Sequence, residues 1–266
     1  MRATPWRIVL RKFAKPGFAR TGIGALSVTV VLVAWQIVGS HGWISSDLIS
    51  YPSQILGAFY DLYVSGEFDA NVFISMTEFI QGFAAAIVAG ILIGLMFAVS
   101  RRLRYLFEPI FVALYTAPMI VFVPVLVVWF GIGPESKSVM VFFTSVIPIA
   151  INTATGVTEV HESWIRALRA FGANRSQIIL KAMLPGALPV IMAGLRLGVG
   201  RGIVVLIAGE MYVSIHGIGR LIQIYSSSGS AAQIFVLVAI VAGFGYLCIT
   251  ILRMIETRLI PWRRST

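Results

Sequence analysis

Charged side chains lie inside long apolar segments of the sequence, among them Glu78, Arg196, Arg201 and Glu210. A charge in lipid is costly, so such residues usually pair with an opposite charge or line a water-filled path. Glu210 follows Arg201 by nine residues, and at about 100° per helical residue the two side chains point to opposite faces and cannot pair directly. Arg196 and Arg201 are about 140° apart by the same rule, so we do not expect one narrow cavity to hold both.

Two interpretations of these charges therefore stay open. In the first, a charged side chain lines a path for a translocated solute, and the candidates are Arg201, Glu210 and Arg196. In the second, the charges form structural ion pairs, for instance Glu78 with an arginine of the apolar segment that holds Arg201.

No group of side chains in the sequence predicts catalysis or a bound metal. The histidines, His41, His161 and His216, have no partner at metal-ligand spacing, and Cys248 is the single cysteine. The patterns G-x-S-x-G, H-E-x-x-H and G-x-x-x-x-G-K-[ST] are absent from the sequence. We therefore expect a chain that is not an enzyme and binds no cofactor itself. Any ATP-driven work would need ATP bound by another polypeptide.

The segments that carry the charges have the composition of membrane helices. Of the 266 residues, 58% are hydrophobic and 12% are charged, and the mean hydropathy is +0.89. Soluble domains have about a quarter charged residues, and a spanning helix needs about 20 apolar residues. We predict an all-α polytopic membrane protein with about six transmembrane helices, because backbone groups in lipid must bond within their own helix. The predicted spans are 22–39, 72–99, 106–130, 139–157, 188–212 and 234–252.

These spans divide the chain into a basic leader, residues 1–21, and one transmembrane domain, residues 22–265, with a polar connection at 158–187. Lysine and arginine gather on alternate connections: six in the leader, three at 101–104, four at 158–187 and four in the C-terminal tail, against two on the opposite side. By the positive-inside rule, both termini and the polar connection are cytoplasmic. The net charge of +10 thus reflects orientation in the membrane, and we expect no nucleic-acid partner.

Small residues and prolines mark particular spans. Interior prolines kink helices, here either as a rigid bend or beside a moving element, and they occur at Pro118, Pro124 and Pro148. Small residues at four-residue spacing predict close helix packing. They are Ala86, Gly90, Gly94 and Ala98 in the second span, and Gly194, Gly198 and Gly202 in the fifth.

The polar connection 158–187 has the pattern of two short amphipathic helices. Gly172 is typical of the residue that follows a helix C-terminus, and Asn174 with Gln177 has the spacing of a capping box for a second helix. We expect Pro185 to end that helix and Pro189 to open the next span. The two apolar faces are Trp164, Ile165, Leu168 and Phe171 in the first helix, and Ile178, Ile179, Ala182 and Met183 in the second.

This connection resembles the EAA loop of permease subunits of binding-protein-dependent ABC importers. The spacing matches the family pattern at Ala167, Gly172, Leu184 and Pro185. The sequence departs from the pattern where Arg166 replaces the glutamate, Leu168 the second alanine and Ala182 the isoleucine. The family's glutamate contact with the ATPase therefore cannot be carried over to Arg166.

Further segments are similar to the nitrate, sulfonate, taurine and bicarbonate branch of these permeases. They include YPSQILGAFYDLYVSGEF (51–68), FVPVLVVWFGIGPESKSV (122–139), LPGALPVIMAGLRLGVGRG (184–202) and AGEMYVSIHGIGRLI (208–222). The similarity runs from about Tyr51 to the C-terminal residues and so covers most of the chain.

The resemblance implies a type I ABC importer permease fold in a prokaryotic plasma membrane. Two copies of this chain would join two ATPase subunits, which bind ATP and Mg, and a periplasmic or extracellular solute-binding protein. The solute would be a small organic or inorganic anion, such as a sulfonate, taurine, nitrate or bicarbonate, and Arg201 would suit it. A secondary transporter or channel subunit without an ATPase is the alternative. The implied ATPase-coupling residues are Arg166, Ala167, Leu168, Phe171, Gly172, Ile178, Met183, Leu184 and Pro185.

Overall fold

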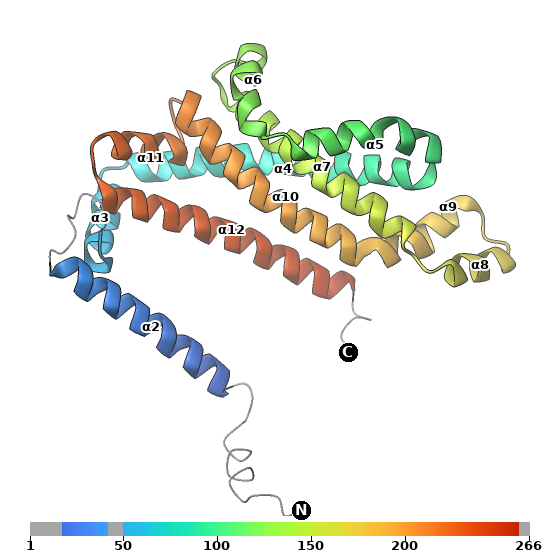
Figure 1. Ribbon diagram of the computed structural model, residues 1–266, viewed down its shortest axis with the longest axis horizontal. Helices are drawn as coiled ribbons and strands as arrows, with labels where there is room; N and C mark the ends of the chain where they lie inside the picture. Colours follow the sequence, from blue (N-terminus) through green and yellow to red (C-terminus); the bar gives the residue numbers. More distant parts are fainter. Residues whose placement is uncertain (1–17, 42–49, 261–266) are drawn as a thin grey trace, which may run out of the picture.

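The computed structural model describes residues 18–41 and 50–260, so most of the predicted leader lies outside the described residues. The described part is helical and contains no strand, which confirms the all-α prediction for these residues (Figure 1). Its helices are α2 (Phe18–Ser40), α3 (Pro52–Val64), α4 (Glu67–Val99), α5 (Arg101–Thr116), η1 (Met119–Phe122), α6 (Val123–Phe130), α7 (Pro134–Thr158), α8 (Glu162–Ala170), α9 (Arg175–Ile178), η2 (Ile179–Met183), α10 (Leu184–Val213), α11 (Ile218–Ser227) and α12 (Ala231–Leu259).

Four stretches of helix are long and apolar enough to cross a membrane. They are α4, α7, the continuous helix Arg175–Val213 and α12; the bent pair of α5 and α6 would be a fifth. The first predicted span, 22–39, falls in α2, whose described apolar part is the shorter helix Leu26–Ser40. Each of the other predicted spans coincides with one of these helical stretches, and the helices extend beyond the predicted bounds.

Helix α7 lies at the centre of the fold, between α4 and α10 (Figure 1). The predicted small-residue stripes of α4 and α10 both pack against it. A Cβ atom added at Gly94 of α4 would lie 2.6 Å from the carbonyl oxygen of Ala150, and one added at Gly194 of α10 would lie 2.7 Å from Cβ of Asn152. Glycine is therefore required where these helix backbones approach α7, which confirms the close packing predicted from the stripes.

The third predicted span, 106–130, is broken rather than kinked. Helix α5 ends at Thr116, and α5 and the helix Met119–Phe130 meet at 93°. Ala117 and Pro118 are both extended, with ψ of 132° and 103°. A residue that precedes proline avoids the helical region. Ala117, which precedes Pro118, is therefore extended, and α5 ends at Thr116. Pro124 lies in the first turn of α6, where a proline is tolerated, and does not kink that helix.

The prediction that Pro185 ends a cytoplasmic helix is wrong. Helices α9, η2 and α10 form one continuous helix from Arg175 to Val213. The five residues of η2 are π-helical, and the amide of Leu184 donates to the carbonyl of Ile179, five residues back. The wider turn admits Pro185, because a π segment does not need the i to i−4 bond that a proline removes. Pro189 likewise lies inside α10 instead of opening it.

The two ends of the bundle differ in sequence character. The turn from α4 to α5, the α8–α9 hairpin and the C-terminal end of α12 gather at one end, whereas α3 and α11 lie at the other (Figure 1). The first of these ends therefore holds the basic connections of the described chain. Helix α2 meets the bundle near its own C-terminus, where Trp35 packs on Phe235 and Gln36 bonds to Ser53 at 3.1 Å.

Candidate functional site

The α8–α9 hairpin is formed by local interactions that its sequence predicts. Gly172 has φ of +78°, a conformation that favours glycine. Two backbone bonds close the end of α8: the amide of Gly172 donates to Arg169, and that of Ala173 to Leu168. This pair of bonds is the Schellman motif. The predicted capping box at the start of α9 is confirmed, with Asn174 and Gln177 bonded reciprocally at 2.9 Å.

The hairpin exposes one of its two apolar faces. Phe171 is 89% exposed and Trp164 is 52% exposed, so two large aromatic side chains of the hairpin are mostly uncovered. Leu168 is half-buried. In contrast, Ile178 is only 7% exposed and Met183 packs against the core, so these two side chains support the hairpin from within. Of the apolar residues that we expected to contact an ATPase, Phe171 is the most accessible.

The remaining residues of the predicted coupling set differ in their exposure. Arg166 is exposed and lies 3.8 Å from Glu162, one helical turn away. Such an exposed pair contributes little to stability. Ala167 is exposed beside it, whereas Leu184 and Pro185 are half-buried at the start of α10. The exposed coupling residues thus lie on α8 and the turn that follows it.

One contact joins the hairpin to a helix distant in sequence. The guanidinium of Arg175 donates to the carbonyl oxygen of Val99 at 3.1 Å. Val99 is the last residue of α4, and carbonyls in the last turn of a helix have no partner within it. A cavity of about 500 Å³ lies beside this contact, between the end of α4 and the hairpin, and Arg169 also lines it. The hairpin is therefore joined to the end of α4 by a polar contact that lies next to open space.

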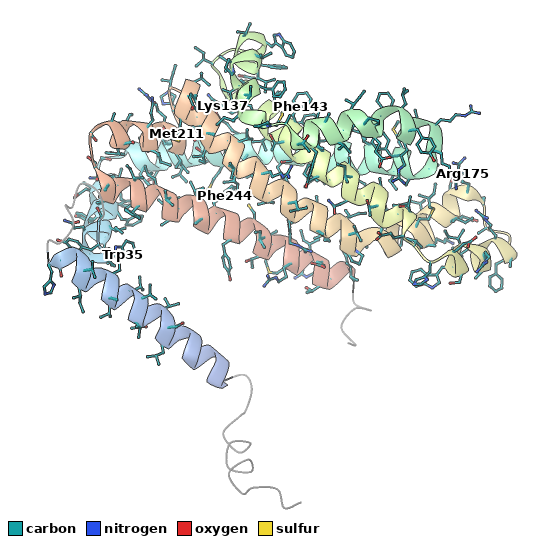
Figure 2. All side chains as sticks on the ribbon, in the orientation of Figure 1. Trp35, Lys137, Phe143, Arg175, Met211 and Phe244 are labelled. Atoms are coloured by element: carbon teal, nitrogen blue, oxygen red, sulfur yellow. The ribbon has the colours of Figure 1, made fainter. Side chains whose placement is uncertain are left out.

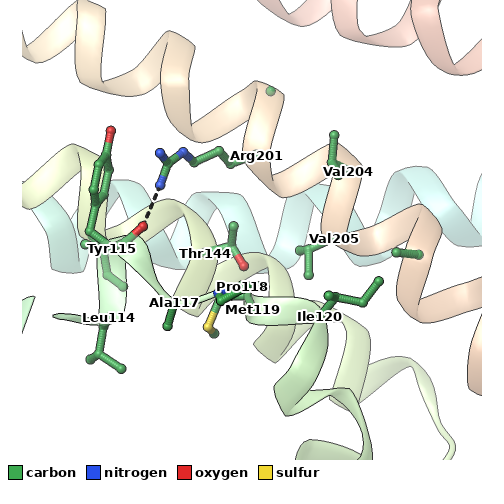
Figure 3. A pocket seen from close by; sticks show the side chains of 13 residues that line it. Leu114, Tyr115, Ala117, Pro118, Met119, Ile120, Thr144, Arg201, Val204 and Val205 are labelled. Carbon is green, nitrogen blue, oxygen red and sulfur yellow. Dashed lines mark hydrogen bonds between the residues drawn. The ribbon is translucent and has the colours of Figure 1, made fainter. Parts of the chain in front are cut away.

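Arg201 lies midway along α10 and lines a cavity of about 460 Å³ at the break between α5 and η1 (Figure 3). Its guanidinium carbon lies 3.8 Å from the centre of the Tyr115 ring. One guanidinium nitrogen donates to the carbonyl oxygen of Tyr115 at 3.2 Å. The break after Thr116 exposes this carbonyl at the end of α5, so the cavity and the arginine's partner both depend on the broken span.

Arg196 is held in a different place. It bonds to the carboxylate of Glu256 on α12 at 2.6 Å. The expectation that one narrow cavity does not hold both Arg196 and Arg201 agrees with these two positions.

Glu210 is fully buried, where α10 meets α4 and α11. Its carboxylate accepts hydrogen bonds from the Ser75 hydroxyl and from the amide of Gly219, at 2.7 Å in the second case. Ser75 in turn accepts from the amide of Ile218, the first residue of α11. The acidic side chain therefore caps the N-terminus of α11, where the helix dipole favours negative charge.

Glu78 pairs with Lys137. The expected example of an ion pair between Glu78 and an arginine of the fifth span is therefore wrong. The Glu78 carboxylate lies 3.9 Å from Nζ of Lys137, and both side chains are buried. Lys137 also donates to the carbonyl of Ile132 at 3.1 Å. Figure 2 shows Lys137 near the end of the bundle opposite Arg175. Sequence reasoning assigned Lys137 to a connection and missed this role, because a lone lysine near a span end gives no sign that it is buried.

Tyr115 is a second residue that the sequence did not indicate. It lies in an ordinary apolar segment, 86 residues before Arg201, and no spacing rule links the two. Its ring and carbonyl lie at the end of α5, just before the 93° bend, where the packing of α5 places them beside Arg201 of α10.

Comparisons with known proteins place the chain among membrane transport subunits. Residues 86–265 match the family of binding-protein-dependent transport system inner membrane components. The chain is 31% identical over 245 residues to the taurine transport system permease protein TauC of Escherichia coli, covering 90% of this chain and 88% of the relative. It is 30% identical to the putative aliphatic sulfonates transport permease protein SsuC of Bacillus subtilis, covering 94% and 92%. The nitrate import permease protein NrtB of Synechocystis is also 30% identical, with 89% and 88% covered.

Two solved structures share the fold. One is the inward-facing MetNI methionine ABC transporter, with a TM-score of 0.62, 21% identity, and coverage of 71% of this chain and 94% of that chain. The other is an amino acid ABC transporter, with a TM-score of 0.58, 15% identity, and coverage of 79% and 100%. These two structures confirm the predicted importer permease fold. The family match and the sequence relatives decide against a secondary transporter or channel. The chain belongs to the family of inner membrane components of binding-protein-dependent transport systems, in which it is a transport subunit and not an enzyme.

Proposed function

We propose that this chain is the membrane subunit of an importer in which two copies join two ATPase subunits and an external solute-binding protein. ATP and Mg bind to the ATPases. The observation that carries the proposal is the exposed aromatic face of a hairpin that is otherwise well defined. A capped hairpin that buries Ile178 but leaves Phe171 in water is suited to insert that side chain into a partner.

The coupling step follows from the way the hairpin is attached. Its second half is continuous with α10, so a displacement of the hairpin by the ATPases acts directly on the helix that carries Arg201. Arg175 connects the same hairpin to the end of α4. Closure of the ATPases would therefore move α4 and α10, the two helices that enclose α7, and change access to the cavity between α10 and the α5 break.

Loss of the exposed aromatic ring tests this docking. In the complete transporter, Phe171→Asp should lower co-purification of the ATPase and abolish ATP-driven uptake. The control is Tyr60→Asp on α3, a side chain that is also mostly exposed but lies outside the predicted spans, at the other end of the bundle. Equal retention of the ATPase by wild type and Phe171→Asp would refute the proposed contact.

We further propose that the solute is a small anion and that Arg201 lies on its path. Two features support this: Arg201 is the arginine of α10 that lines a cavity, and several relatives are named as permeases for anions, namely sulfonates and nitrate. Arg196 and Glu210 have structural partners, an ion pair and a helix cap, so the proposed path does not include them. Arg201→Gln should reduce uptake while the assembled complex persists; uptake at the wild-type rate would refute this role.

The proposed orientation places both termini and the α8–α9 hairpin in the cytoplasm. The basic connections that share one end of the bundle support it. A cysteine introduced by Arg253→Cys should be labelled by a membrane-impermeant maleimide only from the cytoplasmic side, and one introduced by Gln223→Cys on α11 only from the outside.

A further inference from the structure

The cavity at Arg201 has an uneven chemistry that narrows the class of anion it can hold. Most of its lining is aliphatic or thioether, and the ionised group in it is Arg201. The apolar residues include Leu114, Met119, Ile120, Ile147, Val204 and Val205. The cavity volume, about 460 Å³, lies within the range usual for pockets that enclose small organic ligands.

The guanidinium of Arg201 has donors to spare. It has five N–H groups, and the structure gives it one hydrogen bond, to the Tyr115 carbonyl. The guanidinium carbon lies over the ring of Tyr115, and the N–H edges that do not face the Tyr115 carbonyl have no hydrogen bond within the described part of the chain. A sulfonate or carboxylate group can accept two parallel hydrogen bonds from such an edge. Arg201 can therefore bind one anionic head group without losing its contact with Tyr115.

Besides Arg201, two lining residues carry a polar side-chain atom, the hydroxyls of Tyr115 and Thr144. The hydroxyl of Thr144 already donates to the carbonyl of Met140 at 2.8 Å, which leaves it as an acceptor. Nitrate and bicarbonate carry oxygen atoms on every side and need donors around their whole surface. In this cavity, oxygens that face Met119 or Val205 would lose their water without gaining a hydrogen bond, at a large cost in free energy.

We propose that this cavity is a solute site that selects amphipathic organic anions, with the ionic head at Arg201 and an apolar body against the aliphatic lining, and that it rejects small inorganic anions. The inference rests on the proposed role of Arg201 in the path and goes beyond it. It gives the permease its own selection step, after delivery by the binding protein. The cavity discriminates between anions because an anion oxygen buried without a hydrogen bond costs more free energy than the loss of an apolar contact.

Direct binding to the full chain in lipid nanodiscs tests the site without any binding protein. The probe is ³⁵S-labelled 1-butanesulfonate, displaced by methane-, ethane- and hexanesulfonate, by sodium nitrate and by bicarbonate, with empty nanodiscs to subtract partition into lipid. Affinity should rise about fourfold for each added CH₂ group while the body still fits the cavity. Nitrate and bicarbonate should not displace the probe. Displacement by nitrate as effective as by ethanesulfonate, affinity independent of chain length, or no saturable binding would each overturn the inference.

Three variants locate the binding. Arg201→Gln should weaken butanesulfonate binding roughly tenfold to a hundredfold, the usual range for hydrogen bonds to a charged group. Ile120→Asn, at a partly exposed position of the lining, should flatten the chain-length dependence and leave methanesulfonate affinity almost unchanged. Arg253→Gln, the control, removes an exposed arginine from α12 and should bind as wild type. If Arg201→Gln does not fold, chain-length data for wild type and Ile120→Asn still decide the question.

The two proposals fail in different ways. Uptake unchanged in Arg201→Gln, together with selective butanesulfonate binding by the wild type, would refute the path and leave the site. Uptake that needs Arg201, together with equal displacement by nitrate and butanesulfonate, would refute the selectivity and leave the path.

Discussion

Substitution of Gly172 separates two explanations of why the hairpin needs glycine. One explanation is lack of space and the other is backbone conformation. A Cβ atom added at Gly172 would meet no atom within 4 Å, whereas φ is +78°. A side chain here therefore costs backbone strain and causes no collision. An L-residue in the left-handed region costs about 1–2 kcal/mol, and asparagine adopts that region more readily than alanine or valine.

That strain should appear as lost coupling. If it opposes the docked shape of the hairpin, the ratio of correctly formed to unformed hairpins falls roughly 5- to 30-fold. We expect Gly172→Asn to be mild, Gly172→Ala stronger and Gly172→Val strongest in reducing solute uptake. The assay is solute transported per ATP hydrolysed, in proteoliposomes that contain the ATPase and the binding protein. The thermal unfolding midpoint should hardly change, because Gly172 is exposed and outside the core.

The order of the variants is the critical result. Asparagine is larger than alanine, so a steric effect would make Gly172→Asn worse than Gly172→Ala. A loss that follows side-chain volume, or full coupling in Gly172→Val, would refute the conformational argument.

Three further predictions concern the core, the helix cap and the tether. Gly94→Val should destabilise the α4–α7 contact by about 1–3 kcal/mol, because Cβ would press on the Ala150 carbonyl, and should lower the thermal midpoint in nanodiscs; an unchanged midpoint would refute the close approach. Glu210→Ala should leave the buried amide of Gly219, at the start of α11, without its hydrogen-bond partner, which costs about 1–3 kcal/mol of stability. Hydrogen exchange of amides at the start of α11 should therefore be faster, and protection equal to that of the wild type would contradict this. Arg175→Gln should lower solute uptake more than ATPase binding, because it releases the end of α4 and leaves the exposed ring of Phe171 in place. Equal losses of uptake and of ATPase binding would show a general defect of the hairpin.

Matched controls sharpen these three tests. Gly57→Val on α3 adds the same side chain where a Cβ atom meets nothing within 4 Å. Glu159→Ala removes an exposed carboxylate, and Arg169→Gln removes the other arginine of the cavity at the hairpin. Each control variant should keep close to the wild-type value the quantity that its matched test variant changes.

Local sequence was sufficient for the features that depend on a few neighbouring residues. The capping box at Asn174 and the left-handed Gly172 involve residues at most five positions apart, and both were predicted. The membrane class and the alternation of basic connections also follow from sequence, because solvation acts on composition whatever the arrangement of the helices. The small-residue stripes showed which helices pack closely, but not that α7 is the helix between them.

The prolines show what sequence left undecided. Pro148 stays inside α7, Pro185 is absorbed by a π segment, and Pro118 breaks a span at 93°. A proline removes one hydrogen bond in each case, and the surroundings determine the result. Helix α7 is packed between α4 and α10, and it continues through the buried Pro148, whereas the residues that flank Pro118 lie at an open edge of the bundle.

The charged residues divide in the same way. An unpaired charge is costly in a membrane. Sequence alone therefore determined that charged residues in apolar segments must pair with another polar group or serve a function, and this applies to Glu78, Arg196, Arg201 and Glu210. Their partners could not be predicted from spacing: Arg196 bonds to Glu256, 60 residues away, and Arg201 to Tyr115, 86 residues away. Which helices become neighbours is decided by packing of the whole chain, so only the tertiary structure placed one arginine in an ion pair and the other at a cavity.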